Sequence, residues 1–99
     1  MVNLYRKGRI AEGKIARDLQ DKGFQNIRQS AGSRGAADIY AFKGGQKYYV
    51  QVKSGTARAG PEAISRLQRL ARDRSGTAVV INRQDGQNKW RFFGNWGHR

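Results

Sequence analysis

The alternation of apolar and polar side chains is strongest between positions 37 and 53, where it predicts a β-hairpin. Two strand-like runs flank Gly44-Gly45, and glycine readily adopts the positive φ angles of a two-residue hairpin turn. With these glycines as the turn, counting outward places Asp38 directly opposite Gln51. The hairpin register can therefore be predicted together with the strands.

This register separates the side chains of the hairpin into an apolar face and a polar face. The apolar face carries Ala37, Ile39, Ala41, Val50 and Val52. The polar face carries Asp38, Tyr40, Tyr49, Gln51 and Lys53. Opposed side chains have Cβ atoms about 5 Å apart, so a carboxylate, an amide and an ammonium group meet in one patch. The patch is either a solvated sheet surface or a functional site, and the pattern leaves both interpretations open.

Two amphipathic helices are predicted, one on each side of the hairpin in the sequence. The first covers residues 3–22 and ends before Gly23, a residue that suits the end of a helix. Its apolar stripe consists of Leu4, Ala11, Ile15, Ala16 and Leu19. The second begins at Pro61 and runs to about residue 75. Its stripe consists of Ala63, Ile64, Leu67, Leu70 and Ala71.

Three further strands are predicted outside the hairpin. Residues 24–29 form a short candidate whose two apolar anchors are three positions apart, which breaks strict alternation. Residues 77–82 are apolar and β-branched, as in a central strand that is covered on both faces. A turn at Asp85-Gly86 precedes a final strand at residues 89–93. We therefore expect an α/β fold, with a mixed central sheet of about five strands flanked by two main helices.

Composition limits the chemistry and indicates a partner. The 99 residues suit one domain spanning 1–99, and 20 basic against 7 acidic residues give a net charge of +13. Such an imbalance favours a polyanionic partner, with DNA first. Cysteine is absent and His98 is the sole histidine, which excludes thiolate chemistry and multi-histidine zinc sites. No apolar run is long enough to span a membrane, so we expect a cytoplasmic, DNA-associated protein.

Several residues outside the hairpin are candidates for the same site. The loop at residues 30–35 combines glycines with Ser33 and Arg34, which offer backbone N–H groups, a hydroxyl and a guanidinium to a phosphate. Glu12 lies at the edge of the first helix's apolar stripe, where it is either an exposed ion-pair partner or a group that reaches the edge where Asp38 and Gln51 meet. The candidate DNA contacts are Arg6, Lys7, Arg9, Ser33, Arg34 and Arg58.

The aromatic residues near the C-terminus have three possible uses. Trp90, Trp96 and Phe92 or Phe93 can stack on bases, pack in the core or seal a subunit interface. In a small domain we favour the core or an interface.

The order helix, strand, acidic hairpin, helix, strand and strand resembles the PD-(D/E)XK nuclease superfamily, and within it the archaeal Holliday junction resolvase branch. The motifs that carry this resemblance are Glu12, Gly32-Ser-Arg-Gly35, Ala37-Asp38-Ile39, Gln51-Val-Lys53-Ser54, Gly60-Pro61 and Trp90-Arg-Phe-Phe93. Position 51 departs from the family pattern, because Gln stands where Glu or Asp is usual. Related Mrr-like restriction nucleases carry the same substitution.

The resemblance implies a restriction-endonuclease-like core and a Mg²⁺-dependent endonuclease, with Mn²⁺ able to substitute. The expected substrate is a four-way (Holliday) junction or other branched DNA, cut by a homodimer. The implied catalytic residues are Glu12, Ser33, Asp38, Gln51 and Lys53, and the implied metal ligands are Glu12, Asp38 and Gln51. Two alternatives stay open: a restriction-like or repair-like nuclease of duplex DNA, and a basic nucleic-acid-binding protein whose weakened metal site supports no cleavage.

Overall fold

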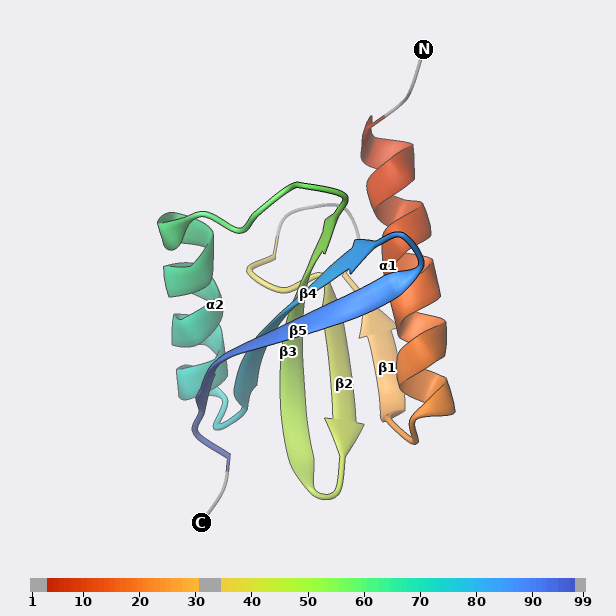
Figure 1. Cartoon of the computed structure of the whole chain (residues 1–99). Helices are drawn as coiled ribbons and strands as arrows, with labels where there is room; N and C mark the ends of the chain where they lie inside the picture. Colours follow the sequence, from red (N-terminus) through yellow and green to blue (C-terminus); the bar gives the residue numbers. More distant parts are fainter. Residues whose placement is uncertain (1–3, 31–34, 98–99) are drawn as a thin grey trace.

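Seven elements build the protein around one sheet (Figure 1). This computed structural model describes residues 4–30 and 35–97, with side chains from residue 10 onward. In chain order the elements are α1 (Leu4–Asp21), β1 (Gln25–Gln29), β2 (Ile39–Lys43), β3 (Gln46–Ser54), α2 (Pro61–Asp73), β4 (Thr77–Gln84) and β5 (Gln87–Asn95). The predicted order of helices and strands is therefore confirmed.

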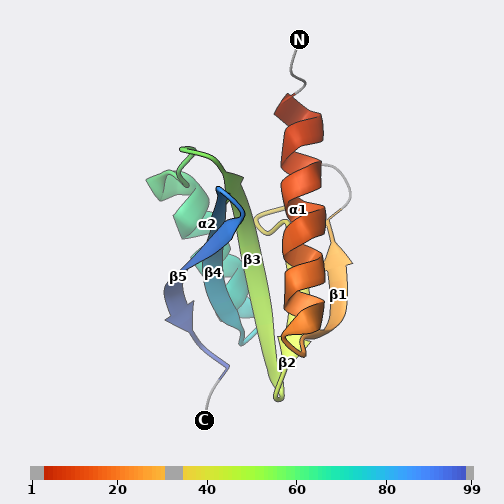
Figure 2. The ribbon, with the colours of Figure 1, turned by 45° about the vertical axis from the view of Figure 1, so that its right-hand side comes forward.

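The five strands lie in the order β1-β2-β3-β4-β5, so β3 is central. The β3–β4 pair is parallel and the other three pairs are antiparallel. A parallel pair needs a crossover connection, which α2 supplies. The two views show the sheet between the helices, with α1 over one face and α2 over the other (Figures 1 and 2). The predicted mixed sheet with two flanking helices is confirmed.

Glycine fixes both hairpins at the predicted positions. Gly44 and Gly45 have φ angles of 59° and 80°, and Lys43 pairs with Gln46 across the turn. The β4–β5 turn at Asp85-Gly86 also has two positive φ angles, 53° and 75°. Turns of this kind match the twist of the strands that they join, so each hairpin has one favoured register.

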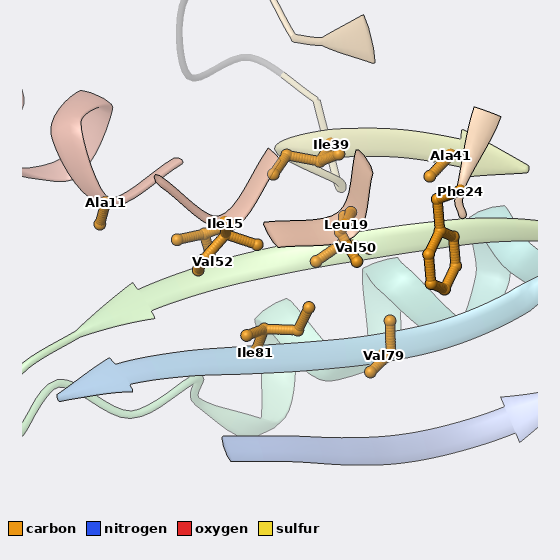
Figure 3. Packing of buried hydrophobic residues seen from close by; sticks show 10 residues of the cluster. All are labelled: Ala11, Ile15, Leu19, Phe24, Ile39, Ala41, Val50, Val52, Val79 and Ile81. Atoms are coloured by element: carbon orange, nitrogen blue, oxygen red, sulfur yellow. The ribbon is translucent and has the colours of Figure 1, made fainter. Parts of the chain in front are cut away.

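The face under α1 is the main apolar core (Figure 3). Figure 3 shows side chains of α1 packed over those of the inner strands. The buried members are Ala11, Ile15, Leu19, Phe24, Ile39, Ala41, Val50, Val52, Val79 and Ile81. Ile15 is fully buried, as expected for the centre of a helix stripe that faces a sheet.

The face under α2 differs from our prediction in two respects. Tyr49 is only 7% exposed and packs with Leu67 and Ala71 of α2, so the hairpin's second face is not wet along its whole length. Ala37 also belongs to this cluster and does not share the face of Ile39. Strict alternation fails there because β2 begins only at Ile39, and the preceding residues are not extended strand. Only the end of this face, beyond Tyr49, is left for polar groups.

Two smaller departures from the sequence pattern have local causes. Asn26 has a φ angle of 51° where the β1–β2 register shifts, and this irregularity explains the three-residue spacing of Phe24 and Ile27. Helix α2 ends at Asp73, two residues earlier than predicted, because Ser75 adopts a φ angle of 55°.

A polar network ties α1 to the β4–β5 hairpin. Arg83 donates to Asp18 Oδ2 at 2.8 Å and to Asn88 Oδ1 at 2.9 Å. Asn88 in turn donates to Asp18 Oδ2 at 2.7 Å. All three side chains are partly buried, so water screens this network less than an exposed pair.

The C-terminal aromatic residues are divided between the core and the surface. Trp90 and Phe93 pack against the two clusters, as predicted. Phe92 is 60% exposed and Trp96 is 38% exposed, so they remain available to a partner. Neither helix is apolar enough over its described length to cross a membrane.

Candidate active site

Asp38 and Gln51 meet at the end of the sheet where β3 finishes and β2 begins. The backbone N–H of Asp38 donates to the Val50 carbonyl at 2.7 Å, which continues the hairpin ladder one residue beyond β2. Gln51 Nε2 donates to Asp38 Oδ2 at 3.1 Å, and the Val52 N–H donates to the same oxygen at 2.8 Å. The predicted register is therefore confirmed.

The electrostatics of Asp38 reflect competing effects. Burial of the carboxyl group raises the pKa of Asp38 above its ordinary value, while the Val52 N–H and the charge of Lys53 act to lower that pKa. The net direction is upward, so burial is the largest effect. A carboxylate that is held this way gains free energy when a cation approaches, which is the behaviour expected of a metal ligand or a catalytic acid.

Lys53 lies on the same strand face as Gln51, because side chains two residues apart on a strand point the same way. The residue is partly buried, and its charge is close enough to influence Asp38. The structure thus brings Asp38, Gln51 and Lys53 together at one end of the sheet.

Glu12 occupies the turn of α1 over the end of β3. It is partly buried and lies between Ala11 and Ile15, which pack in the same cluster as Val52. Its helix covers the sheet face opposite to Gln51 and Lys53, so Glu12 would have to meet Asp38 around the strand end. Its participation in the site stays a prediction.

The donor set suits a hard cation. Both hydrogen bonds described above engage Oδ2 of Asp38, and within the described residues no group donates to Oδ1. Gln51 can add its amide oxygen after the amide turns away from Asp38. Carboxylate and amide oxygens are ligands that Mg²⁺ accepts. The described part of the chain contains no cluster of three His, Cys, Asp or Glu side chains, and position 51 supplies an amide.

For most of the remaining predicted site residues the side chains lie outside the described part of the structure. Ser33 and Arg34 lie outside the described residues, as do the side chains of the α1 cations Arg6, Lys7 and Arg9. Arg58 is exposed in the loop before α2 and lines a pocket with Lys53.

Sequence reasoning missed two polar residues of this pocket. Asn82 is 8% exposed, and its amide donates to the Ala57 carbonyl at 2.9 Å. Arg91 on β5 lines the same pocket. Alternation within residues 89–93 could have placed Arg91 beside Phe93, but the predicted strand was interpreted only through its aromatic residues.

Comparison with known proteins identifies the family. The sequence profile of the archaeal Holliday junction resolvase (Hjc) family matches residues 3–96. Among the 22 chains of solved structures that match is Hjc of the archaeal hyperthermophile Archaeoglobus fulgidus, a Holliday junction resolvase. It is 25% identical, and the match covers 87% of this chain and 75% of that one with a TM-score of 0.71. A search of curated protein sequences gave no significant match. Since the profile spans almost the whole chain, this protein belongs to the archaeal Holliday junction resolvase family.

Proposed function

We propose that the protein is a metal-dependent endonuclease that hydrolyses DNA phosphodiester bonds, and that four-way junctions are its preferred substrate. The observation that carries the proposal is the Asp38 carboxylate, which is partly buried and held by Val52 and Gln51, with Lys53 on the same face. Family membership supports a junction substrate. The net charge of +13 supports DNA binding independently of the family.

In this proposal Asp38 is the principal ligand of Mg²⁺ or Mn²⁺, and Gln51 and Glu12 complete the protein's share of the coordination. When bound, the cation polarises a phosphoryl oxygen and makes an attacking water more acidic. The Val52 N–H donates to the Asp38 carboxylate and holds it in place. Gln51 contributes no formal charge, so Glu12 carries more of the cation's neutralisation than it would beside a second acid.

Lys53 orients the attacking water and stabilises the negative charge that develops on the phosphoryl oxygens. Its ammonium group is suited to this task because its charge interacts with the Asp38 carboxylate at the same end of the sheet. We assign Ser33 and Arg34 to the scissile phosphate or its neighbour. Arg6, Lys7, Arg9 and Arg58 supply further phosphate contacts.

Resolution of a junction needs a cut in each of two strands, and we propose that two copies of this domain make them. The exposed Phe92 on β5 and the nearby Trp96 would be covered by such pairing. Sedimentation equilibrium at micromolar concentration tests this assembly: a dimer is expected, and Phe92→Ser should shift it toward monomer. A monomer at all concentrations with and without junction DNA would contradict it.

The decisive assay compares a labelled four-way junction with linear duplexes of the same sequences and with single strands. Cleavage of the junction is expected in Mg²⁺ or Mn²⁺ and not in EDTA, and Asp38→Asn is the matched inactive control. Equal cutting of duplex and junction would favour the duplex nuclease instead. Failure to cut any of these DNAs would remove the enzyme proposal.

One observation favours a second candidate, a DNA-binding protein with a weakened metal site. Gln51 donates its amide to Asp38, so metal binding must break this bond and gains only a neutral ligand. Calorimetry separates the candidates. Uptake of Mg²⁺ or Mn²⁺ by the wild-type protein with DNA is expected of the enzyme, whereas DNA affinity without metal uptake would identify the binding protein.

Substitution of Gln51 by Glu sharpens this distinction. A glutamate carboxylate cannot donate to Asp38, so the metal-free variant loses the hydrogen bond and gains repulsion, at a cost of about 1–3 kcal/mol in stability. For an active site, Gln51→Glu should tighten metal binding and preserve or raise cleavage, and added Mg²⁺ should recover the lost stability. Thermal unfolding with and without Mg²⁺ measures the effect. A destabilisation that Mg²⁺ does not reverse would speak against Gln51 as a ligand.

A further inference from the structure

The sheet register places Arg91 in the same cross-strand row as Gln51. Gln51 pairs with Val80 on β4, and Val80 pairs with Arg91 on β5. Paired residues point to the same face of a sheet, and two strand spacings amount to about 10 Å. Lys53 pairs with Asn82 in the next row. One row therefore runs from Gln51 beside Asp38, past the buried Val80, to Arg91 on the edge strand.

These side chains surround a small pocket beside the candidate active site. Lys53, Arg58, Asn82 and Arg91 contribute its polar groups, and its apolar lining includes Val80 and Phe93. The buried Asn82 amide holds the Ala57 carbonyl at 2.9 Å and so fixes the loop that presents Arg58. The Arg91 guanidinium lies over the Phe93 ring, 5.4 Å from its centroid, which limits its rotation. The Arg91 side chain is thus positioned by a contact within the protein, and the backbone next to Arg58 is fixed.

The pocket lining carries three cations and no acidic residue, although Lys53 also interacts with the nearby Asp38 carboxylate. Within residues 10–30 and 35–97, Lys53, Arg58 and Arg91 make no ion pair; the pairs found there are Arg66–Glu62 and Arg83–Asp18. Three cations around one pocket repel one another, and an anion placed between them relieves that repulsion. Arginine also presents paired N–H donors that match phosphate oxygens.

The size of the pocket restricts which anion it can take. Its volume of about 20 Å³ admits a group of the size of one water molecule. One non-bridging phosphate oxygen fits this space, whereas a base or a sugar does not. The pocket therefore suits a phosphodiester that lies across the surface and places one oxygen in it.

We propose that Arg91 and Arg58 form a subsite for the DNA phosphate next to the scissile one, with Lys53 at the border between this subsite and the candidate catalytic site. The proposal has two parts. Phosphate binding at this subsite is independent of the proposed nuclease function, whereas the claim that the adjacent phosphate is cleaved rests on it. Arg91 is a positioning residue in this scheme: it fixes the strand so that the adjacent phosphodiester lies over Asp38.

Arg91→Gln tests the subsite, with Arg69→Gln as a matched control. Arg69 is exposed on α2, lines none of the described pockets around the site and loses the same charge. Anisotropy with a short single-stranded oligonucleotide in EDTA measures binding without cleavage. Arg91→Gln should weaken binding about tenfold and lower the salt slope by about 0.7, whereas Arg69→Gln should have a smaller effect. Arg91→Lys should retain part of the affinity.

Titration with inorganic phosphate, followed by NMR, gives an independent measurement. Shifts of the Ala57, Arg58 and Arg91 amides are expected in the wild type and in Arg69→Gln, but not in Arg91→Gln. Equal weakening by the two glutamine variants, or no local shifts, would overturn the subsite even if the protein cleaves junctions. Loss of binding in Arg91→Gln alone, in a protein that cuts no DNA, would keep the subsite and remove the nuclease. In an active protein, Arg91→Gln should raise KM more than it lowers kcat.

Discussion

The two faces of the sheet have different compositions although the same strands form both. Under α1 the cluster is apolar from Ala11 to Phe24, and the strands add Ile, Val and Ala. Under α2 the apolar packing of Leu67 and Ala71 reaches only part of the face. Asp38 and Arg91 lie at the two ends of one cross-strand row, with the buried Val80 of the apolar cluster between them.

The α1 face therefore contributes mainly to stability, and the polar end of the α2 face carries the candidate site. A buried apolar group contributes most when it excludes water completely, whereas a charged site must remain open to a ligand. Alternation on each strand lets one residue serve the core while its neighbour serves the site: Val52 is 9% exposed under α1, and Lys53 faces the other way. Substitutions on the two faces should therefore give different phenotypes.

The largest expected effect is that of Asp38→Asn. If Asp38 is the principal metal ligand that we propose, its loss removes several kcal/mol of transition-state stabilisation, or about three powers of ten in rate. The Asn oxygen can still accept from the Val52 N–H, so the fold and most of the DNA affinity should survive. Single-turnover cleavage of a labelled junction measures the loss, and a variant that cuts as fast as the parent would overturn the assignment.

Lys53→Ala should reduce the rate by about 10²–10³, because one positioned donor to a developing negative charge is worth that much. Unfolding by urea should show little change, since Lys53 is not part of either apolar cluster. A large loss of stability with full activity in the folded fraction would place Lys53 in a structural role.

A substitution in the core under α1 should lower stability and leave the cleavage rate nearly unchanged, the opposite of Lys53→Ala. Ile15 is fully buried under α1, so Ile15→Val should cost about 0.5–1.5 kcal/mol of unfolding free energy. Cleavage well below the melting temperature should remain near the parent rate. Reduced cleavage at full folding would show that α1 packing controls the site, for example through Glu12.

The smallest effect is a pH-dependent stability difference. Because burial raises the pKa of Asp38 in the folded protein, its ionised form opposes folding at neutral pH. Asp38→Asn should therefore be slightly more stable than the parent at pH 7, and the difference should vanish as the pH falls below the ordinary value of 3.8. Urea unfolding at several pH values tests the sign. Greater stability of the parent at pH 7 would contradict it.

The fold was predictable to the extent that local pattern determines it. The Gly44-Gly45 turn sets the register that brings Asp38 to Gln51, so the turn and the count of residues from it located the centre of the candidate site. Burial of Tyr49 was not predictable, because it depends on how α2 crosses the face. Arg91 was missed for the same reason: its place beside the site follows from the parallel β3–β4 pairing, which no local pattern encodes.

The network of Asp18, Arg83 and Asn88 has a consequence for folding kinetics. It joins residues 65 and 70 positions apart, so chain entropy opposes its formation until the sheet is largely assembled. We expect these bonds to form after the rate-limiting step. Asp18→Asn should then accelerate unfolding while leaving the refolding rate nearly unchanged in stopped-flow experiments. The network would thus mainly slow unfolding and so lengthen the lifetime of the native state.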